Sequence, residues 1–140
     1  MKHFLITVLS VFLFACSSEN YVTTELKPLS EKGLFGQNYK AYNAISKRES
    51  VISVVEMPRA SFSESKIQAL EQGLLDEGWI LKGENQGFYS YCKGKDKRIH
   101  LAIVNSHFMF DDQFNRYEFE NLDTIVLNYR FYKYGVDRCI

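Results

Sequence analysis

The chain has 140 residues, of which 46% are hydrophobic and 15% are aromatic. Seventeen Lys and Arg residues balance seventeen Asp and Glu residues, so the formal net charge is zero. Nucleic-acid binding needs a basic surface, so this composition argues against a nucleic-acid partner.

The first fifteen residues predict a signal peptide. Lys2 places a positive charge near the start, and Phe4 to Ala15 is an uncharged, mostly apolar run. This run is too short to span a bilayer, which needs about 20 residues. It has the length of the apolar region of a secretory signal. We therefore expect residues 1–15 to be removed on export.

The apolar run ends in Leu13-Phe14-Ala15-Cys16. This segment resembles the lipobox of bacterial lipoproteins, which it matches at Leu13, Ala15 and Cys16 and departs from at Phe14. The resemblance covers only these residues. It implies that Cys16 carries acyl groups such as palmitate and anchors the protein in the bacterial cell envelope, facing the periplasm. In the sorting pattern of enteric lipoproteins, an Asp after the Cys signals retention in the inner membrane, so the resemblance implies that Ser17 favours the outer membrane. The alternative is an ordinary signal peptide in which Cys16 is incidental.

Residues 16–37 are polar, contain one proline and two glycines, and show no sustained periodicity. We expect them to form a flexible tether behind the lipidated Cys16. The alternative is that Leu34 and Phe35 dock on the domain. The remaining residues, 38–140, have the size of a single domain with a modest core.

Six strands are expected around one main helix. The strands are residues 39–45, 51–57, 79–82, 88–93, 98–105 and 124–134. Runs of strands around one helix predict an α+β fold, in which the helix packs on an antiparallel sheet of about four to six strands. By analogy of element order alone, a cystatin-like or helix-grip-like two-layer arrangement would suit this sequence.

The main helix is expected over residues 61–77. Ser61 and Glu64 have the spacing of a capping box, which satisfies two backbone N–H groups at a helix start. Apolar residues at helical spacing predict a buried face that consists of Ile67, Leu70 and Leu74, widened by Ala69 and Leu75. Gly78 suits the left-handed position after a helix, so that Trp79 would close back onto the helix and join the core.

Two cysteines remain beyond the lipobox, Cys92 and Cys139. An exported chain meets an oxidising environment, in which such pairs are normally bridged. We therefore predict a disulfide that joins the C-terminal end to a strand in the middle of the chain. The alternative is two free thiols. A zinc site is not expected, because two cysteines with no nearby histidine give too few ligands.

The segment 106–123 is long for a connection, and long loops tend to be functional or to hold structure of their own. Aromatic residues within it have helical spacing, which predicts a short amphipathic helix packed on the sheet. The alternative is a binding lip. The candidate binding residues are Phe108, Phe110, Phe114, Tyr117 and, on the mixed face of the last strand, Tyr132. Not all rings of this segment fit on one side of a short helix, so at least one should remain accessible.

The sequence contains no nucleophile elbow, P-loop, dinucleotide-binding fingerprint or HExxH motif. His100 lies on the face of its strand opposite to the apolar residues, as surface or packing histidines do. His107 with Asp111 and Asp112 matches no established metal-ligand spacing. We therefore name no catalytic residue, no metal ligand and no cofactor.

Three functions are compatible with these features. The first is a non-enzymatic, lipid-anchored binding or accessory module that contacts another envelope protein. The second is a periplasmic lipoprotein that binds a small ligand in an aromatic groove. The third, for which the sequence offers least, is an enzyme.

Overall fold

The structure is a computed structural model that describes residues 20–140. The predicted signal peptide and Cys16 lie outside the described residues, so both stay predictions. The elements are α1 (Lys27–Glu31), β1 (Lys40–Lys47), β2 (Ser50–Pro58), the 3₁₀ turn η1 (Arg59–Ser61), α2 (Glu64–Asp76), β3 (Ile80–Asn85), β4 (Phe88–Lys93), β5 (Lys97–Ile103), β6 (Phe108–Phe110), β7 (Arg116–Glu118) and β8 (Thr124–Tyr132).

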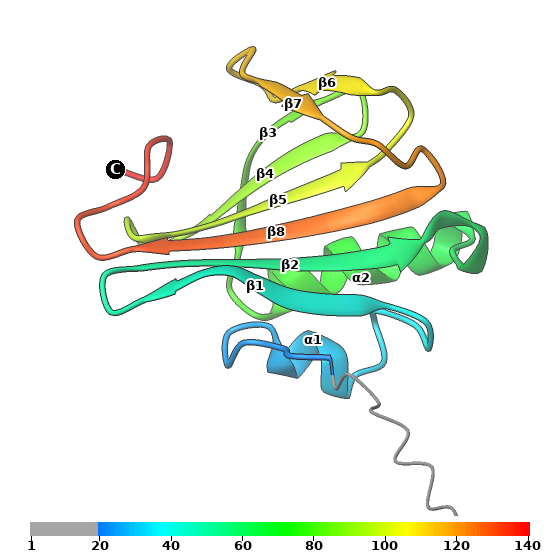
Figure 1. Cartoon of the computed structure of the whole chain (residues 1–140), viewed down its shortest axis with the longest axis horizontal. Helices are drawn as coiled ribbons and strands as arrows, with labels where there is room; N and C mark the ends of the chain where they lie inside the picture. Colours follow the sequence, from blue (N-terminus) through cyan, green and yellow to red (C-terminus); the bar gives the residue numbers. More distant parts are fainter. Residues whose placement is uncertain (1–19) are drawn as a thin grey trace, which may run out of the picture.

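Six of the strands form one antiparallel sheet in the order β1-β2-β8-β5-β4-β3, and α2 crosses one face of it (Figure 1). The predicted α+β fold, with one main helix on an antiparallel sheet, is confirmed. The last long strand, β8, lies in the middle of the sheet between β2 and β5. Strands from both halves of the chain therefore pair along it.

The core lies between the sheet and α2. Because successive residues of a strand point to opposite faces, only alternate residues reach this core. On β5 they are Ile99 and Leu101, and on β8 they are Ile125, Leu127 and Tyr129. These residues meet the buried face of α2, which consists of Ile67, Leu70, Gly73 and Leu74.

The start of α2 differs from the prediction. Ser63 is the N-cap, and its hydroxyl oxygen accepts a hydrogen bond from the Lys66 backbone N–H at 3.4 Å. Ser61 instead closes η1, the turn in which the chain leaves β2 after Pro58. The predicted capping box at Ser61 and Glu64 is therefore wrong, because this turn uses the residues that would have begun the helix.

The end of α2 is as predicted. Gly78 has a φ of +87°, a left-handed conformation that suits glycine. The Trp79 N–H donates to the Leu74 carbonyl and the Gly78 N–H donates to the Leu75 carbonyl, each at 3.0 Å. This pair of hydrogen bonds is the Schellman motif, and it directs the Trp79 ring into the core. Leu75 itself is 46% exposed and Ala69 is exposed, so neither widens the buried face as predicted.

The flexible tether predicted for residues 16–37 is wrong for the part that the structure describes. Three of its side chains are fully buried in the core: Leu26, Leu29 and Phe35. The α1 segment lies beside α2 (Figure 1), and Gly73 permits the close approach. A Cβ atom at Gly73 would lie only 2.3 Å from Leu34 Cδ1. The alternative expectation, that Leu34 and Phe35 dock on the domain, is thus correct.

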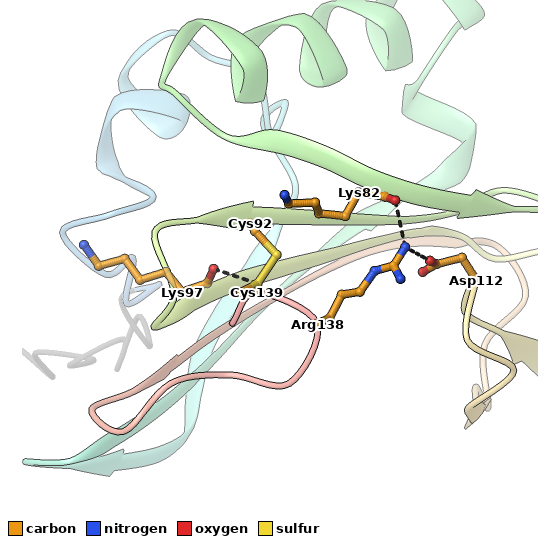
Figure 2. The surroundings of a disulfide bond; sticks show 6 residues. All are labelled: Lys82, Cys92, Lys97, Asp112, Arg138 and Cys139. Carbon is orange, nitrogen blue, oxygen red and sulfur yellow. Dashed lines mark hydrogen bonds and ion pairs between the residues drawn. A yellow bond between two sulfur atoms is a disulfide. The ribbon is translucent and has the colours of Figure 1, made fainter.

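The predicted disulfide between Cys92 and Cys139 is present, with the two Cα atoms 5.6 Å apart. It fastens the chain after β8 to β4 (Figure 2). The hairpin between β3 and β4 is tighter than expected, because pairing continues to Asn85 and Phe88 and leaves only two residues in the turn.

Candidate functional site

The sheet face turned away from α2, which we call the open face, carries the two surface features that suit binding. The β6–β7 hairpin folds over β4 and β5 on this face, and the C-terminal segment 133–140 folds back near the other end of the sheet (Figure 1). Between them lie the outward residues of β5 and β8, including Arg98 and Arg130.

The segment 106–123 forms the β6–β7 hairpin, so the predicted amphipathic helix is wrong. Met109 pairs with Tyr117, and both pack downward onto a small cluster that also contains Phe88, Ala102 and Val104. Because strand residues alternate, the neighbours Phe108 and Phe110 point outward and are 46% and 43% exposed. The buried residues of this segment therefore recur every two residues, as in a strand, and not every 3.6 residues, as in a helix.

The hairpin turn displays Phe114 at its tip. The buried carboxylate of Asp111 accepts bonds from the Gln113 and Asn115 backbone N–H groups and from the Asn115 amide, each at 2.9 Å. Burial acts to raise the pKa of Asp111, but these hydrogen bonds outweigh it and hold that pKa below its usual value. Phe114 follows with a φ of +63° and 81% of its surface exposed. A bulky residue in this left-handed conformation is uncommon and marks a candidate functional position.

The structure separates the five predicted binding residues. Three rings project from the hairpin: Phe108, Phe110 and Phe114. Tyr117 lies beneath the hairpin, with its ring centre 4.8 Å from that of Phe88. Tyr132 lies at the far end of β8, beside Tyr134. The structure therefore does not bring Tyr132 together with the hairpin rings.

His100 is a packing residue beneath the same hairpin. It is 5% exposed, and its ring meets those of Phe88 and Tyr117 edge-on at 5.0 and 5.2 Å. Burial, assisted by the nearby Arg98 charge, lowers the pKa of His100 to about 3. The imidazole is therefore neutral at neutral pH. His107 is separate from it and lies with Nδ1 2.8 Å from the Phe119 carbonyl oxygen.

Acid is expected to destabilise the domain through His100. An unfolded histidine has a pKa near 6.5, so below that pH the unfolded chain binds a proton that the folded protein does not. The stability that neutral His100 contributes is complete above about pH 6.5 and is lost progressively toward pH 3, at up to about 1.4 kcal/mol per pH unit.

Urea unfolding between about pH 7 and about pH 5 measures this slope. His100→Phe keeps an aromatic ring in place and should remove the slope, whereas His107→Gln, which changes an exposed ring, should retain it. A slope that persists in His100→Phe would assign the acid sensitivity to other groups.

A second feature of the open face is a pocket of about 350 Å³, which we call the arginine pocket. Its lining consists of Ser50, Arg98, Arg130, Tyr132, Gly135, Val136 and Asp137. Arg98 and Arg130 are directly opposite one another on β5 and β8. Arg98 is half-buried, and this burial, together with the neighbouring Arg130 charge, lowers its pKa against the opposing effects of Tyr117, Asp111 and Asp137.

The rim of the arginine pocket consists of residues 135–137, which belong to the chain that follows β8. The Val136 N–H donates to the Lys95 carbonyl at 2.8 Å. Arg138 donates to the Lys82 carbonyl at 2.7 Å and forms an ion pair with Asp112 of the hairpin turn (Figure 2). Cys139 is bonded to Cys92. The rim and the two residues that follow it are thus attached to β3, to β4, to the turn between β4 and β5, and to the hairpin turn.

Sequence reasoning missed this pocket. The predicted strands 98–105 and 124–134 contain Arg98 and Arg130, but the sequence did not indicate that these two strands are neighbours. Only the pairing of β5 with β8 places the two side by side. The alternation on both strands was a usable signal, but the order of strands in the sheet was needed to interpret it.

Comparison of the chain with protein-family models, with curated proteins and with solved structures finds no match in any of the three. Within residues 20–140, neither helix has the length and apolar character needed to cross a membrane.

Proposed function

We propose that this protein is a non-enzymatic, lipid-anchored module of the bacterial cell envelope that contacts another envelope protein through its β6–β7 hairpin. The observation that carries the proposal is the display of three large rings, Phe108, Phe110 and Phe114, on the outer side of one hairpin. Clustered exposed apolar groups mark interaction sites, and aromatic residues are enriched in interface hot spots.

The position of the anchor supports a protein partner. Asn20 is held at the start of β1 by two hydrogen bonds: its amide donates to the carbonyl of Tyr39, just before the strand, at 2.8 Å, and its oxygen accepts from the Ala41 N–H at 3.1 Å. Three residues lie between Cys16 and Asn20, so the two Cα atoms are four residue steps apart, and four steps extend at most about 14 Å. Acyl groups on Cys16 would therefore hold the β1 side of the domain close to the membrane.

The hairpin lies on the other side of the molecule. It packs on β4 and β5, whereas β1 is an edge strand separated from β5 by β2 and β8 (Figure 1). With the β1 side at the membrane, the exposed rings point away from the anchoring lipid. This orientation suits a partner protein that lies in the periplasm or on the side of the periplasm opposite to the anchoring membrane.

The replacement Phe114→Asn should separate binding from stability. Asn adopts the left-handed conformation more readily than Phe, which pays roughly 1–2 kcal/mol for it, so the melting temperature should stay the same or rise. Partner contact should fall because the most exposed ring is lost. Thermal unfolding measures the first effect. A photo-crosslinking residue at position 110 in living cells, followed by mass spectrometry, measures the second.

Two controls make this test specific. The same crosslinker at the exposed Tyr21 position, on the β1 side, should not capture the partner. Met109 is the buried neighbour of Phe108 and Phe110 in β6, so Met109→Asn should lower the melting temperature instead. If Phe114→Asn leaves the crosslinked partner unchanged, or if the hairpin captures only a second copy of this chain, the proposed contact is wrong.

A further inference from the structure

We propose that the arginine pocket binds a phosphate group, held between Arg98 and Arg130. This site is distinct from the hairpin contact proposed above and does not depend on it. The two arginines form its floor, and residues 135–137 form its rim.

The arrangement of the arginines is the first argument. Directly opposite residues on neighbouring antiparallel strands have Cβ atoms about 4.5–5.5 Å apart, and like charges at such positions are destabilising. Among residues 20–140, the ion pairs join other side chains, and neither Arg98 nor Arg130 takes part in one. The fold thus keeps two adjacent positive charges that an anion from outside can neutralise.

The surrounding groups are the second argument. Asp137 is the one carboxylate that lines the pocket, and it is exposed at the rim. Asp111, the other nearby carboxylate, is held by neutral donors of the hairpin turn and acts on Arg98 without lining the pocket. The Ser50 and Tyr132 hydroxyls lie in the same lining and can donate further hydrogen bonds. The pocket therefore combines a net positive charge with neutral donors.

Charge selects phosphate, and the volume of about 350 Å³ leaves room for the molecule that carries it. A phosphate monoester carries about −1.5 to −2 charges at neutral pH, so it balances two guanidinium groups better than a single carboxylate does. Guanidinium groups also match phosphate oxygens geometrically, with two parallel N–H donors each.

The test compares pocket variants with a matched arginine elsewhere. All proteins begin at Cys16 and carry Cys16→Ser, so that no acyl group is present. Inorganic phosphate is titrated at constant ionic strength while the amide NMR signals of residues 135–137 are followed. We expect saturation with a dissociation constant of about 1 mM or below. Arg98→Gln and Arg130→Gln should each weaken it by about 10-fold to 100-fold. Arg48→Gln, in the exposed turn between β1 and β2, should leave it unchanged.

Thermal unfolding shows whether each variant is folded. Without phosphate, Arg130→Gln should melt no lower than the parent chain, because one of two repelling charges is gone. Phosphate should raise the melting temperature of the parent and of Arg48→Gln, since a ligand that binds only the folded state stabilises it. Both pocket variants should lack this rise. Arg130 is exposed, so its variant tests the proposal even where Arg98→Gln does not fold.

The source of the phosphate is resolved by two further arms, glycerol phosphate in solution and vesicles that contain phosphatidic acid. Competition by glycerol phosphate without vesicle binding assigns a soluble ligand. Sedimentation with phosphatidic acid vesicles that the Arg variants abolish assigns a lipid headgroup. Either result supports phosphate recognition. The absence of both, or equal affinity in the parent and the pocket variants, overturns the proposal.

Discussion

The double replacement Cys92→Ala with Cys139→Ala is expected to lower the free energy of unfolding by roughly 4 kcal/mol. The bond joins residues separated by 47 positions, so its loss frees a long loop in the unfolded chain. It also releases the segment after β8, whose other attachments include hydrogen bonds and the ion pairs of Lys133 and Arg138. Urea unfolding of the parent and the variant measures the difference.

Reductant provides the matched control for this prediction. The parent protein in dithiothreitol should unfold at the same urea concentration as the double variant, and dithiothreitol should not affect the variant itself. Equal stability of the oxidised and reduced parent would contradict the prediction, because the bond would then contribute nothing to the folded domain.

The replacement Leu70→Ala is expected to cost about 2–5 kcal/mol, since it leaves a cavity at the centre of the core. Leu70 lies on the sheet-facing side of α2 and is fully buried. Leu75→Ala, one turn further along the same helix, is the control. Leu75 is 46% exposed, so its truncation should change the stability by no more than about 0.5 kcal/mol.

Both variants change the helix propensity by the same amount, because each replaces leucine by alanine. The difference between them therefore reports burial alone, and urea unfolding of both proteins measures it. Comparable losses in the two variants would mean that the face of α2 toward the sheet is assigned wrongly.

Regular elements with strong local signals were predictable from the sequence. The buried stripe of α2 begins with Ile67, and its glycine-terminated end was also recognised, because helical spacing and left-handed glycine are local properties. The strands β2, β5 and β8 were recognised from their β-branched and alternating residues. The disulfide followed from the small number of cysteines in a chain expected to be exported.

Two segments were misread because their structure depends on distant partners. Leu26, Leu29 and Phe35 show no regular spacing, since they are spread over a five-residue helix and a loop that α2 and the sheet hold in place. The hairpin rings happened to fall at helical spacing although the segment pairs as strands. In both cases tertiary packing decided the conformation.

The candidate sites show the same division. The expectation that at least one ring of the segment 106–123 stays accessible agrees with the exposure of Phe114. The meeting of Arg98 with Arg130 depends on strand order, which no local pattern encodes. The position of the rim over the pocket depends further on where the chain travels after β8.

The bond between Cys92 and Cys139 also sets the moment at which the arginine pocket is complete. The cytosol keeps thiols reduced, and the compartment to which residues 1–15 are predicted to direct the chain oxidises them. On the predicted export route, Cys139 bonds to Cys92 only in the oxidising compartment, so the rim gains its covalent attachment to β4 there. The prediction of export therefore carries a second one: the arginine pocket is completed only after the chain has crossed the membrane.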